Sequence, residues 1–363
     1  MRMENRKTRV CHFTSAHDAQ DDRIYLKECI SLEKAGYDVC LAAKGESRED
    51  SGIKTAGCGM AGNRFERIFS FSRKVYKKAL GIDADIYHFH DPELLPYALK
   101  LKRKGKIVIF DSHEDIPSQI LDKEWIPAFL RRIISRLYKM YESYVVKRLD
   151  AVVAATPHIA KQFKGRAERV EVVNNYPKLD DITFHDRPFA EREKIVCYAG
   201  GISEQRGEKV MLEAVKGLDA TLILAGDHEE LRTGQAVYTG KLNREQVNEL
   251  YGRSVAGMVT LLPMANYIYS QPIKMFEYMA AGLPFVASDF SLWKSIVEEN
   301  GCGICVDCGK TDEVREAVKR LLEDPCRAQE MGRNGRKAVE IKYNWDVEEK
   351  KLVSLYQDLL GKR

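Results

Sequence analysis

The sequence predicts an α/β protein made of two doubly wound, Rossmann-like domains. Short apolar runs alternate with amphipathic helical stretches from end to end, a pattern typical of parallel sheets joined by crossover helices. The chain has 363 residues, which is long for one hydrophobic core and suits two domains. Between the two series of elements, residues 174–188 lack both periods and contain an Asn-Asn pair, two prolines and several aspartates. This segment is therefore the expected linker.

The strands follow one another in two series. The first series is expected at residues 9–14, 38–43, 86–89, 107–111, 151–155 and 170–173, and the second at residues 194–199, 220–225, 236–239, 256–261, 284–287 and 303–306. We expect an N-terminal domain at residues 1–174, a linker at 175–188, a C-terminal domain at 189–344 and a final helix at 345–363. Ligands are expected where the carboxyl ends of the strands of both domains face a shared cleft.

The composition favours some classes of protein and excludes others. Hydrophobic residues make up 44% and charged residues 31%, values typical of a soluble globular protein. The sequence lacks both the roughly eighteen consecutive apolar residues of a membrane-spanning helix and the pattern of an export signal. A net charge of +4 is too small to indicate nucleic-acid binding by itself. We therefore expect a cytoplasmic protein.

The nine cysteines are odd in number and spread over both halves, which favours free thiols in a reducing compartment. Cys302, Cys305 and Cys308 are spaced like metal ligands, with Cys326 as a fourth. However, the run G-C-G-I-C-V-D is typical of a short buried strand, in which cysteine serves as a small apolar residue. We favour the strand.

The most informative segment runs from Ser270 to Asp289, S-Q-P-I-K-M-F-E-Y-M-A-A-G-L-P-F-V-A-S-D. A proline near the first helical position leaves the amides of Ile273 and Lys274 pointing out of the helix start, where an anion binds well. Lys274 and Glu277, three residues apart, are neighbours on the helix surface. This arrangement suits a diphosphate joined to a ribose. The plainer interpretation is a solvent-exposed Lys-Glu pair.

The same segment resembles the C-terminal signature of the family 4 retaining glycosyltransferases, enzymes of the GT-B fold. In that family a Glu, seven residues and a second Glu precede a Met-Ala-small-Gly stretch and a Pro-led strand. Glu277 matches the second Glu, which holds the donor ribose, and Ile273 and Lys274 match the positions whose amides hold the diphosphate. Tyr269 stands in the place of the first Glu, a departure from the family pattern. The resemblance also implies that the final helix crosses back onto the first domain.

A second glycine-bearing turn, Y-A-G-G-I-S-E-Q-R-G, runs from Tyr198 to Gly207 between a strand and a helix. Such a turn lets the backbone approach a phosphate, and an arginine there can hold two oxygens. The turn resembles the family's Gly-Arg-Leu to Lys-Gly turn, with Arg206 in the place of the usual Lys and Gly201 in the place of the usual Arg. The expected donor contacts are Gly201, Arg206, Leu242, Ile273, Lys274 and Glu277.

In the first domain, the run D-I-Y-H-F-H-D-P-E, residues 85–93, ends a strand and starts a helix. His90 matches a position where many family members have a histidine that faces the donor sugar, and Asp91 is the candidate to orient it. His90, Arg206 and Lys274 form the expected catalytic set.

His88 and His90 also suggest metal ligands. They alternate with Phe89 on a strand, however, and in the GT-B fold amides and cations neutralise the diphosphate. We therefore expect no metal and no other cofactor, with a nucleoside-diphosphate sugar as the substrate.

Two further strand ends supply candidates for the acceptor. D-S-H-E-D, residues 111–115, delivers His113 and Glu114 to the same rim, and Asp22 and Arg23 lie in the first strand-to-helix turn. These four residues are the expected acceptor contacts. The Gly-x-Gly-x-x-Gly run at residues 57–62 follows the second strand instead of the first, which argues against dinucleotide binding.

Two basic amphipathic stretches belong to the first domain. The cations are Arg64, Arg67, Arg73, Lys74, Lys77 and Lys78 in one, and Arg131, Arg132, Arg136, Lys139, Lys147 and Arg148 in the other; aromatic and aliphatic residues alternate with them. Helices of this kind can lie on anionic membrane surfaces. Solvated faces of packed helices are the plainer interpretation, but the pair favours a lipid-linked acceptor.

The resemblance implies a retaining glycosyltransferase that moves a sugar from a nucleoside diphosphate, expected to be UDP, to a lipid-linked or polysaccharide acceptor. The product would be a cell-surface glycan such as lipopolysaccharide or capsule, made at the inner face of the membrane. Negative charge develops on the departing diphosphate, so fixed cations and amides lower the barrier most. Two alternatives are a sugar-nucleotide epimerase of the same fold and a non-catalytic membrane- or partner-binding module, for which Tyr269 argues.

Overall fold

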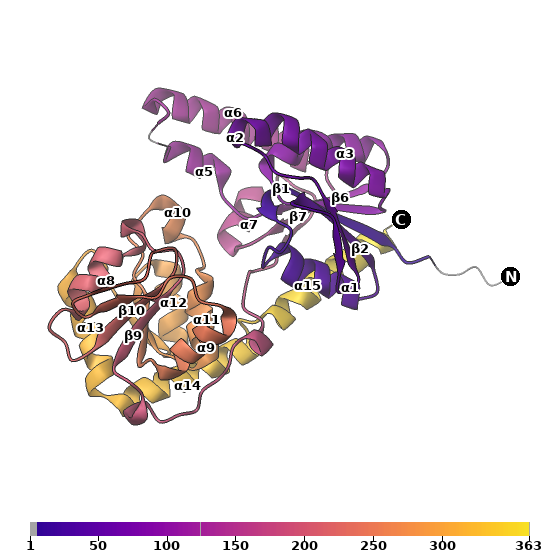
Figure 1. The fold of residues 1–363 in the computed structure, drawn as a ribbon. Helices are drawn as coiled ribbons and strands as arrows, with labels where there is room; N and C mark the ends of the chain where they lie inside the picture. Colours follow the sequence, from indigo (N-terminus) through magenta and orange to yellow (C-terminus); the bar gives the residue numbers. More distant parts are fainter. Residues whose placement is uncertain (1–5, 124, 363) are drawn as a thin grey trace. The chain divides into compact units, whose positions relative to one another are not determined.

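The computed structural model describes residues 6–123 and 125–362 and divides the chain into two compact units (Figure 1). The N-terminal unit comprises residues 1–175 and 348–363, and the C-terminal unit comprises residues 176–347. From Tyr176 onward the predicted linker belongs to the C-terminal unit, and Tyr176 and Ile182 are buried in the hydrophobic core of that unit. Helix α15 (Trp345–Gly361) begins in the C-terminal unit and continues as part of the N-terminal unit from Glu348 onward.

The N-terminal unit contains an eight-stranded sheet with the order β3-β4-β2-β1-β5-β6-β7-β8. The strands are β1 (Arg9–Asp18), β2 (Asp38–Lys44), β3 (Arg48–Asp50), β4 (Ile53–Gly57), β5 (Ile86–Phe89), β6 (Ile107–Ser112), β7 (Ala151–Ala154) and β8 (Val170–Val172). All neighbours are parallel except β3 and β4, which form an antiparallel edge that the sequence did not predict.

The helical segments of the N-terminal unit connect these strands. They are η1 (Ile24–Cys29), α1 (Ile30–Lys34), α2 (Arg64–Glu66), η2 (Arg67–Phe71), α3 (Ser72–Ile82), η3 (Pro92–Leu94), α4 (Leu95–Arg103), α5 (Ile116–Leu121), α6 (Ala128–Val146) and α7 (Pro157–Phe163), with α15 in addition. The segments η1 and η2 are π-helical turns that run directly into α1 and α3.

The two faces of this sheet differ because successive side chains on a strand point in opposite directions. Phe13 of β1 and Phe89 of β5 lie in an apolar cluster with residues of α3, α4 and α6. The alternate positions carry His12 and His88, which are paired in register and fully buried. Tyr356 of α15 forms hydrogen bonds with both of these histidines.

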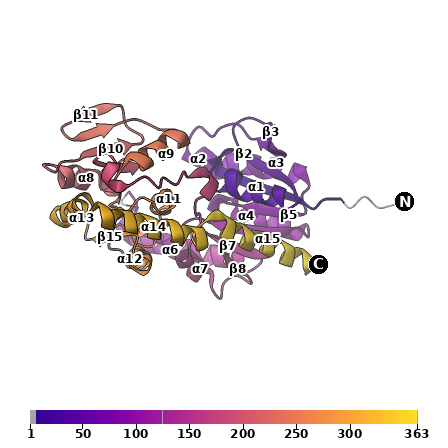
Figure 2. The ribbon, with the colours of Figure 1, turned by 90° about the horizontal axis from the view of Figure 1, so that it is seen from below.

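The C-terminal unit contains a seven-stranded sheet with the order β11-β12-β10-β9-β13-β14-β15. The strands are β9 (Ile195–Ala199), β10 (Thr221–Ala225), β11 (Leu231–Thr233), β12 (Ala236–Tyr238), β13 (Ala256–Val259), β14 (Phe285–Ser288) and β15 (Gly303–Val306). The short antiparallel β11, which the sequence did not predict, lies beyond β12 at the edge (Figure 2).

The helical segments of the C-terminal unit are η4 (Leu179–Asp181), η5 (Phe189–Glu191), η6 (Glu204–Arg206), α8 (Glu208–Val215), α9 (Arg244–Arg253), α10 (Ala265–Ile268), α11 (Ile273–Ala281), α12 (Ser291–Asn300), α13 (Thr311–Glu323) and α14 (Pro325–Ile341). Helix α9 starts with a capping box: Asn243 accepts from the N–H of Gln246, whose side chain accepts from the N–H of Asn243. Helix α11 ends at Gly282, whose φ of 68° suits glycine.

Both sheets reverse their strand order next to the first strand of the unit. In the N-terminal unit the order reverses between β1 and β5, and in the C-terminal unit between β9 and β13. Ligands of open α/β sheets bind at the carboxyl ends of the strands at such a switch point. Functional residues are therefore expected at these two sets of strand ends.

Candidate functional site

A pocket of about 390 Å³ lies at the carboxyl ends of β9 and β10 in the C-terminal unit. Its lining includes Gly201, Leu242 and Glu277, three of the predicted donor contacts. The segments that follow the two strands approach each other closely here. A Cβ on Gly226 would lie only 2.0 Å from the carbonyl oxygen of Gly200. The predicted glycine turn therefore forms a wall of the pocket, and side chains at these glycines would not fit between the strand ends and their neighbours.

The structure brings Arg206 and Lys274 to this same turn. A Cβ on Gly200 would lie 2.9 Å from Nζ of Lys274, and a Cβ on Gly201 would lie 2.7 Å from Nη1 of Arg206. The Lys274 ammonium also lies 3.6 Å from the ring centre of Tyr198. Within the described part of the chain, neither cation forms an ion pair with a carboxylate. Two neighbouring positive groups without carboxylate partners favour the binding of an anion.

The ammonium of Lys274 is also affected by its surroundings. Burial lowers the pKa of Lys274 to about 7, and the guanidinium of Arg206 acts in the same direction. A diphosphate placed beside the ammonium would favour its charged form and reverse this shift.

Helix α11 begins at Ile273, directly after Pro272. The N–H groups of Ile273 and Lys274 lie in the first helical turn, where no preceding turn supplies acceptors. Together with the helix dipole, these groups favour negative charge at the start of α11. The predicted amides are thus on the same helix as the ammonium of Lys274.

One turn further along α11, Glu277 lines the pocket and is held from two sides. Arg244 Nη1 lies 2.8 Å from Glu277 Oε1, and the Tyr251 hydroxyl donates to Oε2 over 3.1 Å. Both partners come from α9, and the sequence did not single them out. The capping signal N-R-E-Q at residues 243–246 could have located the start of that helix. Tyr269, which replaces the family's first Glu, lies between α10 and α11 and is 52% exposed.

At the switch point of the N-terminal unit, Asp91 anchors the C-terminal half of β1, where the pairing with β2 becomes irregular after Phe13. Its Oδ2 accepts hydrogen bonds from the Thr14 hydroxyl at 2.7 Å and from the N–H groups of Ser15 and Ala16 at 2.6 and 3.2 Å. A carboxylate that accepts several hydrogen bonds from one segment of backbone fixes the shape of that segment. Asp91 therefore holds the irregular part of β1. The sequence had suggested that Asp91 orients His90, but the hydrogen bonds of Asp91 Oδ2 go to β1 instead.

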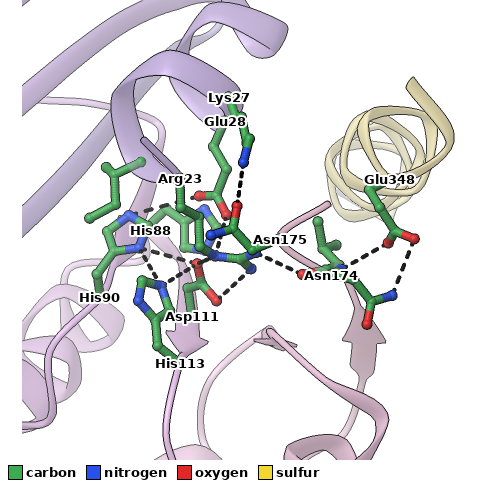
Figure 3. A network of polar contacts seen from close by, with 12 residues as sticks. Arg23, Lys27, Glu28, His88, His90, Asp111, His113, Asn174, Asn175 and Glu348 are labelled. Carbon is green, nitrogen blue, oxygen red and sulfur yellow. Dashed lines mark hydrogen bonds and ion pairs between the residues drawn. The ribbon is translucent and has the colours of Figure 1, made fainter. Parts of the chain in front are cut away.

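His90 lies inside the unit with both ring nitrogens engaged (Figure 3). Its Nδ1 is 3.2 Å from Asp111 Oδ2, and its Nε2 is 3.0 Å from His12 Nδ1. The prediction that His90 faces a donor sugar is therefore corrected: its imidazole is enclosed beneath the rim and supports Asp111.

Arg23 is also enclosed, which corrects its predicted contact with an acceptor (Figure 3). Its guanidinium donates to both oxygens of Asp111, at 2.9 and 3.0 Å, and to the carbonyl of Val173 at 2.8 Å. Burial opposes ionisation of Asp111, but Arg23 and His113 outweigh it and hold the pKa of Asp111 well below its usual range. The ion pair between Arg23 and Asp111 is thus structural and lies at the carboxyl end of β6.

Other predicted acceptor residues stay at the surface. Glu114 and Asp22 are exposed, and Asp22 pairs with Lys27. His113 is partly exposed, and its Nε2 lies 2.8 Å from Asp111 Oδ2. His17, a residue that the sequence did not assign, lies with its ring centre 5.2 Å from that of His113. The rim therefore presents imidazoles and carboxylates to the solvent.

Two groups of side chains are close enough to share a metal ion: His12, Glu28, His88 and His90 form one, and His90, Asp111 and His113 form the other. Within residues 6–123 and 125–362, neither group includes a cysteine. Cys302 and Cys308 are buried beside β15, and Cys326 is exposed. A helix with the length and apolar character of a membrane span was not found within these same residues.

Two family models match the chain. The model described as Glycosyltransferase Family 4 matches residues 26–176, and the model described as Glycosyl transferases group 1 matches residues 180–338. The two matches correspond closely to the two units of the structure.

Curated relatives are distant but cover much of the chain. Alpha-D-kanosaminyltransferase of Streptomyces kanamyceticus is 23% identical over 252 residues, which cover 63% of this chain and 65% of that protein. D-rhamnosyltransferase WbpZ of Pseudomonas aeruginosa is 24% identical over 289 residues, which cover 73% of this chain and 71% of that protein. The match thus spans about two thirds of the length of these relatives.

Solved structures resemble the whole chain. Sucrose-phosphate synthase from Thermosynechococcus elongatus superposes with a TM-score of 0.79 at 18% identity, over 98% of this chain and 100% of that one. HepE from Anabaena in complex with UDP has a TM-score of 0.71 at 12% identity, over 97% and 100% of the two chains. The two family models, the named relatives and this shared fold place the chain in the family 4 glycosyltransferases with the GT-B fold.

Proposed function

We propose that this protein is a retaining glycosyltransferase that moves a sugar from a UDP-sugar to a lipid-linked or polysaccharide acceptor in the synthesis of a cell-surface glycan. The observation that carries the proposal is the meeting of Arg206, Lys274 and the start of α11 at one glycine turn beside a pocket. This arrangement offers positive charge and backbone N–H groups without a carboxylate partner for either cation among the described residues.

The donor would bind with its diphosphate on Arg206, Lys274 and the first amides of α11, and with its ribose hydroxyls on Glu277. Arg244 and Tyr251 keep the carboxylate of Glu277 in place, so it can accept from two neighbouring hydroxyls without reorganisation. The UDP donor is suggested by HepE, whose structures hold UDP and UDP-glucose. Leu242 lines the same pocket and would contact the nucleoside.

The transfer step would be driven by charge stabilisation. Negative charge develops on the departing diphosphate, and cations and amides already in place stabilise this charge with little reorganisation. Since these groups neutralise the diphosphate, we propose that the step itself needs no metal or other cofactor. The leaving phosphate would take the proton of the acceptor on the same face of the sugar, which gives retention.

We assign the acceptor to the rim of the N-terminal unit, at His113, Glu114 and Asp22. His113 is held by Asp111, and Asp111 is held by Arg23 and His90. His90 therefore contributes to the proposed reaction by positioning His113. Phosphatidyl-myo-inositol mannosyltransferase of Mycobacterium leprae, 28% identical over 180 residues, bears the name of an enzyme with a lipid acceptor.

The basic helices of the N-terminal unit would hold the protein at the inner face of an anionic membrane. In and beside α2, η2 and α6, large apolar side chains are exposed among cations; Phe65 is 77% exposed and Trp125 is 72% exposed. Aromatic side chains beside lysine and arginine suit the boundary between lipid headgroups and acyl chains.

Binding of sedimented vesicles tests the membrane assignment. Vesicles with anionic lipid should retain the protein, and the double variant Trp125→Ser, Phe129→Ser should reduce the bound fraction several-fold. Ile341→Ser on α14, which also removes an exposed apolar side chain, is the matched control. Equal binding of all three proteins would remove this part of the proposal.

A thermal-shift screen with UDP, GDP and ADP tests the donor site, because a ligand of the folded state raises the melting temperature. UDP should give the largest rise, and Arg206→Ala or Lys274→Ala should abolish it. Arg253→Ala, an arginine paired with Glu193 elsewhere in this unit, should keep it. No shift with any nucleotide would contradict the proposal.

Product analysis separates the proposed transferase from the alternatives. A labelled sugar should move from the UDP-sugar to extracted membrane lipids or glycan with its anomeric configuration retained. An epimerase would convert the sugar nucleotide with no acceptor present. A binding module would retain lipid or a partner but give neither product.

A further inference from the structure

Three histidines gather on the sheet face opposite the apolar cluster of the N-terminal unit. His88 lies on β5 and His90 follows that strand directly, while His12 on β1 is the register partner of His88. Their alternation with Phe89, which argued against a metal from the sequence, puts both imidazoles of the His88-Phe89-His90 run on one face. All three histidines are buried, and Glu28 of η1 is buried beside them.

The distances among these side chains are those of a small coordination sphere. His12 Nδ1 lies 3.0 Å from His90 Nε2 and 3.7 Å from Glu28 Oε2, and His90 Nε2 lies 4.0 Å from Glu28 Oε2. One ligand atom from each of these residues and from His88 lies within 4.8 Å of the others. Tetrahedral zinc with bonds of about 2.0–2.1 Å separates its ligand atoms by about 3.3–3.5 Å, which lies inside this range.

Hydrogen bonding leaves polar atoms of this cluster without partners. His88 Nε2 and both carboxylate oxygens of Glu28 are buried and have no hydrogen-bond partner in the part of the chain that the structure describes. Oε1 of Glu28 still pairs electrostatically with Arg23 Nε at 3.2 Å, so Oε2 is the atom left for the histidines. Buried polar atoms without partners are costly, by about 1–3 kcal/mol each, and need an explanation.

The other nitrogen of each imidazole is held from outside the cluster. His90 Nδ1 is on Asp111 Oδ2, while His12 Nε2 and His88 Nδ1 are both on the Tyr356 hydroxyl, at 3.2 and 2.9 Å. Histidines that bind a metal generally have their second ring nitrogen fixed by a carboxylate or another polar group in this way. This outer layer would fix the ring orientations that coordination requires.

We propose that His12, Glu28, His88 and His90 bind one divalent transition metal, with zinc as the ion that three imidazoles and one carboxylate fit best. Four protein ligands in a site closed to solvent are the mark of a structural ion. The metal would join β1, β5 and η1 beneath Tyr356 of α15 and stabilise the N-terminal unit. This inference does not depend on the proposed function, whose donor pocket belongs to the C-terminal unit.

A metal-free hydrogen-bond chain is the alternative that an experiment must separate. In that chain Tyr356 would donate to His12, His12 to His90 and His90 to Asp111, while His88 would donate to Tyr356. The chain accounts for four contacts but still leaves His88 Nε2 and Glu28 Oε2 without a hydrogen-bond partner among the described residues.

Metal analysis of the full-length protein is the first test. The protein is produced in medium supplemented with zinc, purified without chelator, and its metal content is measured by inductively coupled plasma mass spectrometry. Wild type should carry close to one zinc per chain, and Glu28→Gln should lose most of it. His113→Gln, which removes a histidine of the neighbouring cluster and none of the four ligands, should keep the zinc. Wild type without metal, or equal zinc in wild type and Glu28→Gln, overturns the proposal.

A second measurement uses wild type alone, in case a buried variant fails to fold. Protein unfolded with a chelator and refolded with zinc should melt several degrees higher than protein refolded without metal. Refolding with cobalt instead should give the visible absorption of a tetrahedral cobalt site. Equal melting temperatures and a colourless cobalt sample would mean that the four residues form the hydrogen-bond chain, and would overturn the metal site.

Discussion

The cations at the two switch points of this molecule differ in whether they have carboxylate partners. At the glycine turn after β9, Arg206 and Lys274 lie against backbone and the ring of Tyr198, with no ion pair within the described residues. At the strand ends of the N-terminal unit, Arg23 has bidentate contacts to Asp111, a further contact to Glu28, and a hydrogen bond to a carbonyl. Both regions concentrate polar residues at equivalent places of a doubly wound sheet.

This difference in pairing separates cations that hold the fold together from cations that an anionic ligand could neutralise. A buried cation with a carboxylate partner is already compensated and holds the fold together. Cations without such a partner leave an unfavourable field that an anion removes on binding. This contrast is consistent with the proposed diphosphate site in the C-terminal unit and with a structural role for the ion pair in the N-terminal unit.

The largest effect is expected from a change that breaks the buried ion pair between Arg23 and Asp111. Asp111→Asn would leave the buried guanidinium of Arg23 without its bidentate partner and should lower the free energy of unfolding by about 3–5 kcal/mol. Denaturant unfolding followed by far-UV circular dichroism would measure it.

Asp18→Asn is the matched control for this change. It breaks the exposed pair with Lys44 and should alter stability by less than about 1 kcal/mol. If Asp111→Asn cost no more than this control, Arg23 would not depend on Asp111, and the contrast between the two regions would fail.

The next effect tests the region after β9, where the cations Arg206 and Lys274 have no carboxylate partner among the described residues. Arg206→Ala should reduce kcat/KM for the proposed sugar transfer by a factor of about a hundred or more, because a fixed cation facing the departing diphosphate is lost. The free energy of unfolding should hardly change, since Arg206 closes no ion pair among residues 6–123 and 125–362. Steady-state kinetics with the UDP-sugar and chemical denaturation together measure the two outcomes.

Arg206→Ala is informative in either direction. A large loss of stability with unchanged kinetics would show that Arg206 is structural, like Arg23. Arg206→Lys should restore part of the activity, because it returns the charge without the fork of donors.

Local signals in the sequence located the structural elements of the C-terminal candidate site. Pro272 marked the start of α11, the glycines marked the turn after β9, and Glu277 followed from its spacing to Lys274. Each of these residues acts through its own segment, so its sequence neighbours carry the information. The apolar runs of the central strands were predictable for the same reason, whereas β4 and the short, largely exposed edge strands β3 and β11 were not.

The interior of the N-terminal unit depends on residues that are far apart in the sequence. The hydroxyl of Tyr356 meets His12 across 344 positions, and Arg23 meets Asp111 across 88. The residues next to His90 in the sequence give no sign that both of its ring nitrogens have partners. A sequence pattern could thus identify His90 and Arg23 as important but could not tell an enclosed residue from one that faces a ligand.

A smaller effect is expected where α15 joins the compensated region. Tyr356→Phe removes the hydroxyl shared by His12 and His88 and leaves ring nitrogens in the interior without a partner, which should cost about 1–3 kcal/mol in unfolding free energy. Tyr37→Phe is the matched control, because the buried ring of Tyr37 packs edge-on against that of Tyr356, with ring centres 5.7 Å apart. Equal, small effects of the two changes would mean that the hydroxyl contributes little to the network.

The smallest effect, and the sharpest test of the uncompensated region, is the dependence of donor binding on pH. The pKa of Lys274 is lowered to about 7 in the protein without ligand, first by burial and then by Arg206. Below pH 7 the ammonium is charged and ready for a diphosphate, whereas above pH 7 binding must first take up a proton. Affinity for UDP-glucose, whose diphosphate does not titrate near neutral pH, should therefore weaken by about tenfold from pH 6 to pH 8.

Lys274→Arg should remove the dependence, because a guanidinium stays charged over this range. Titration calorimetry at several pH values measures both proteins. A flat profile for wild type, or the same slope in Lys274→Arg, would show that the charge of Lys274 is not what holds the diphosphate.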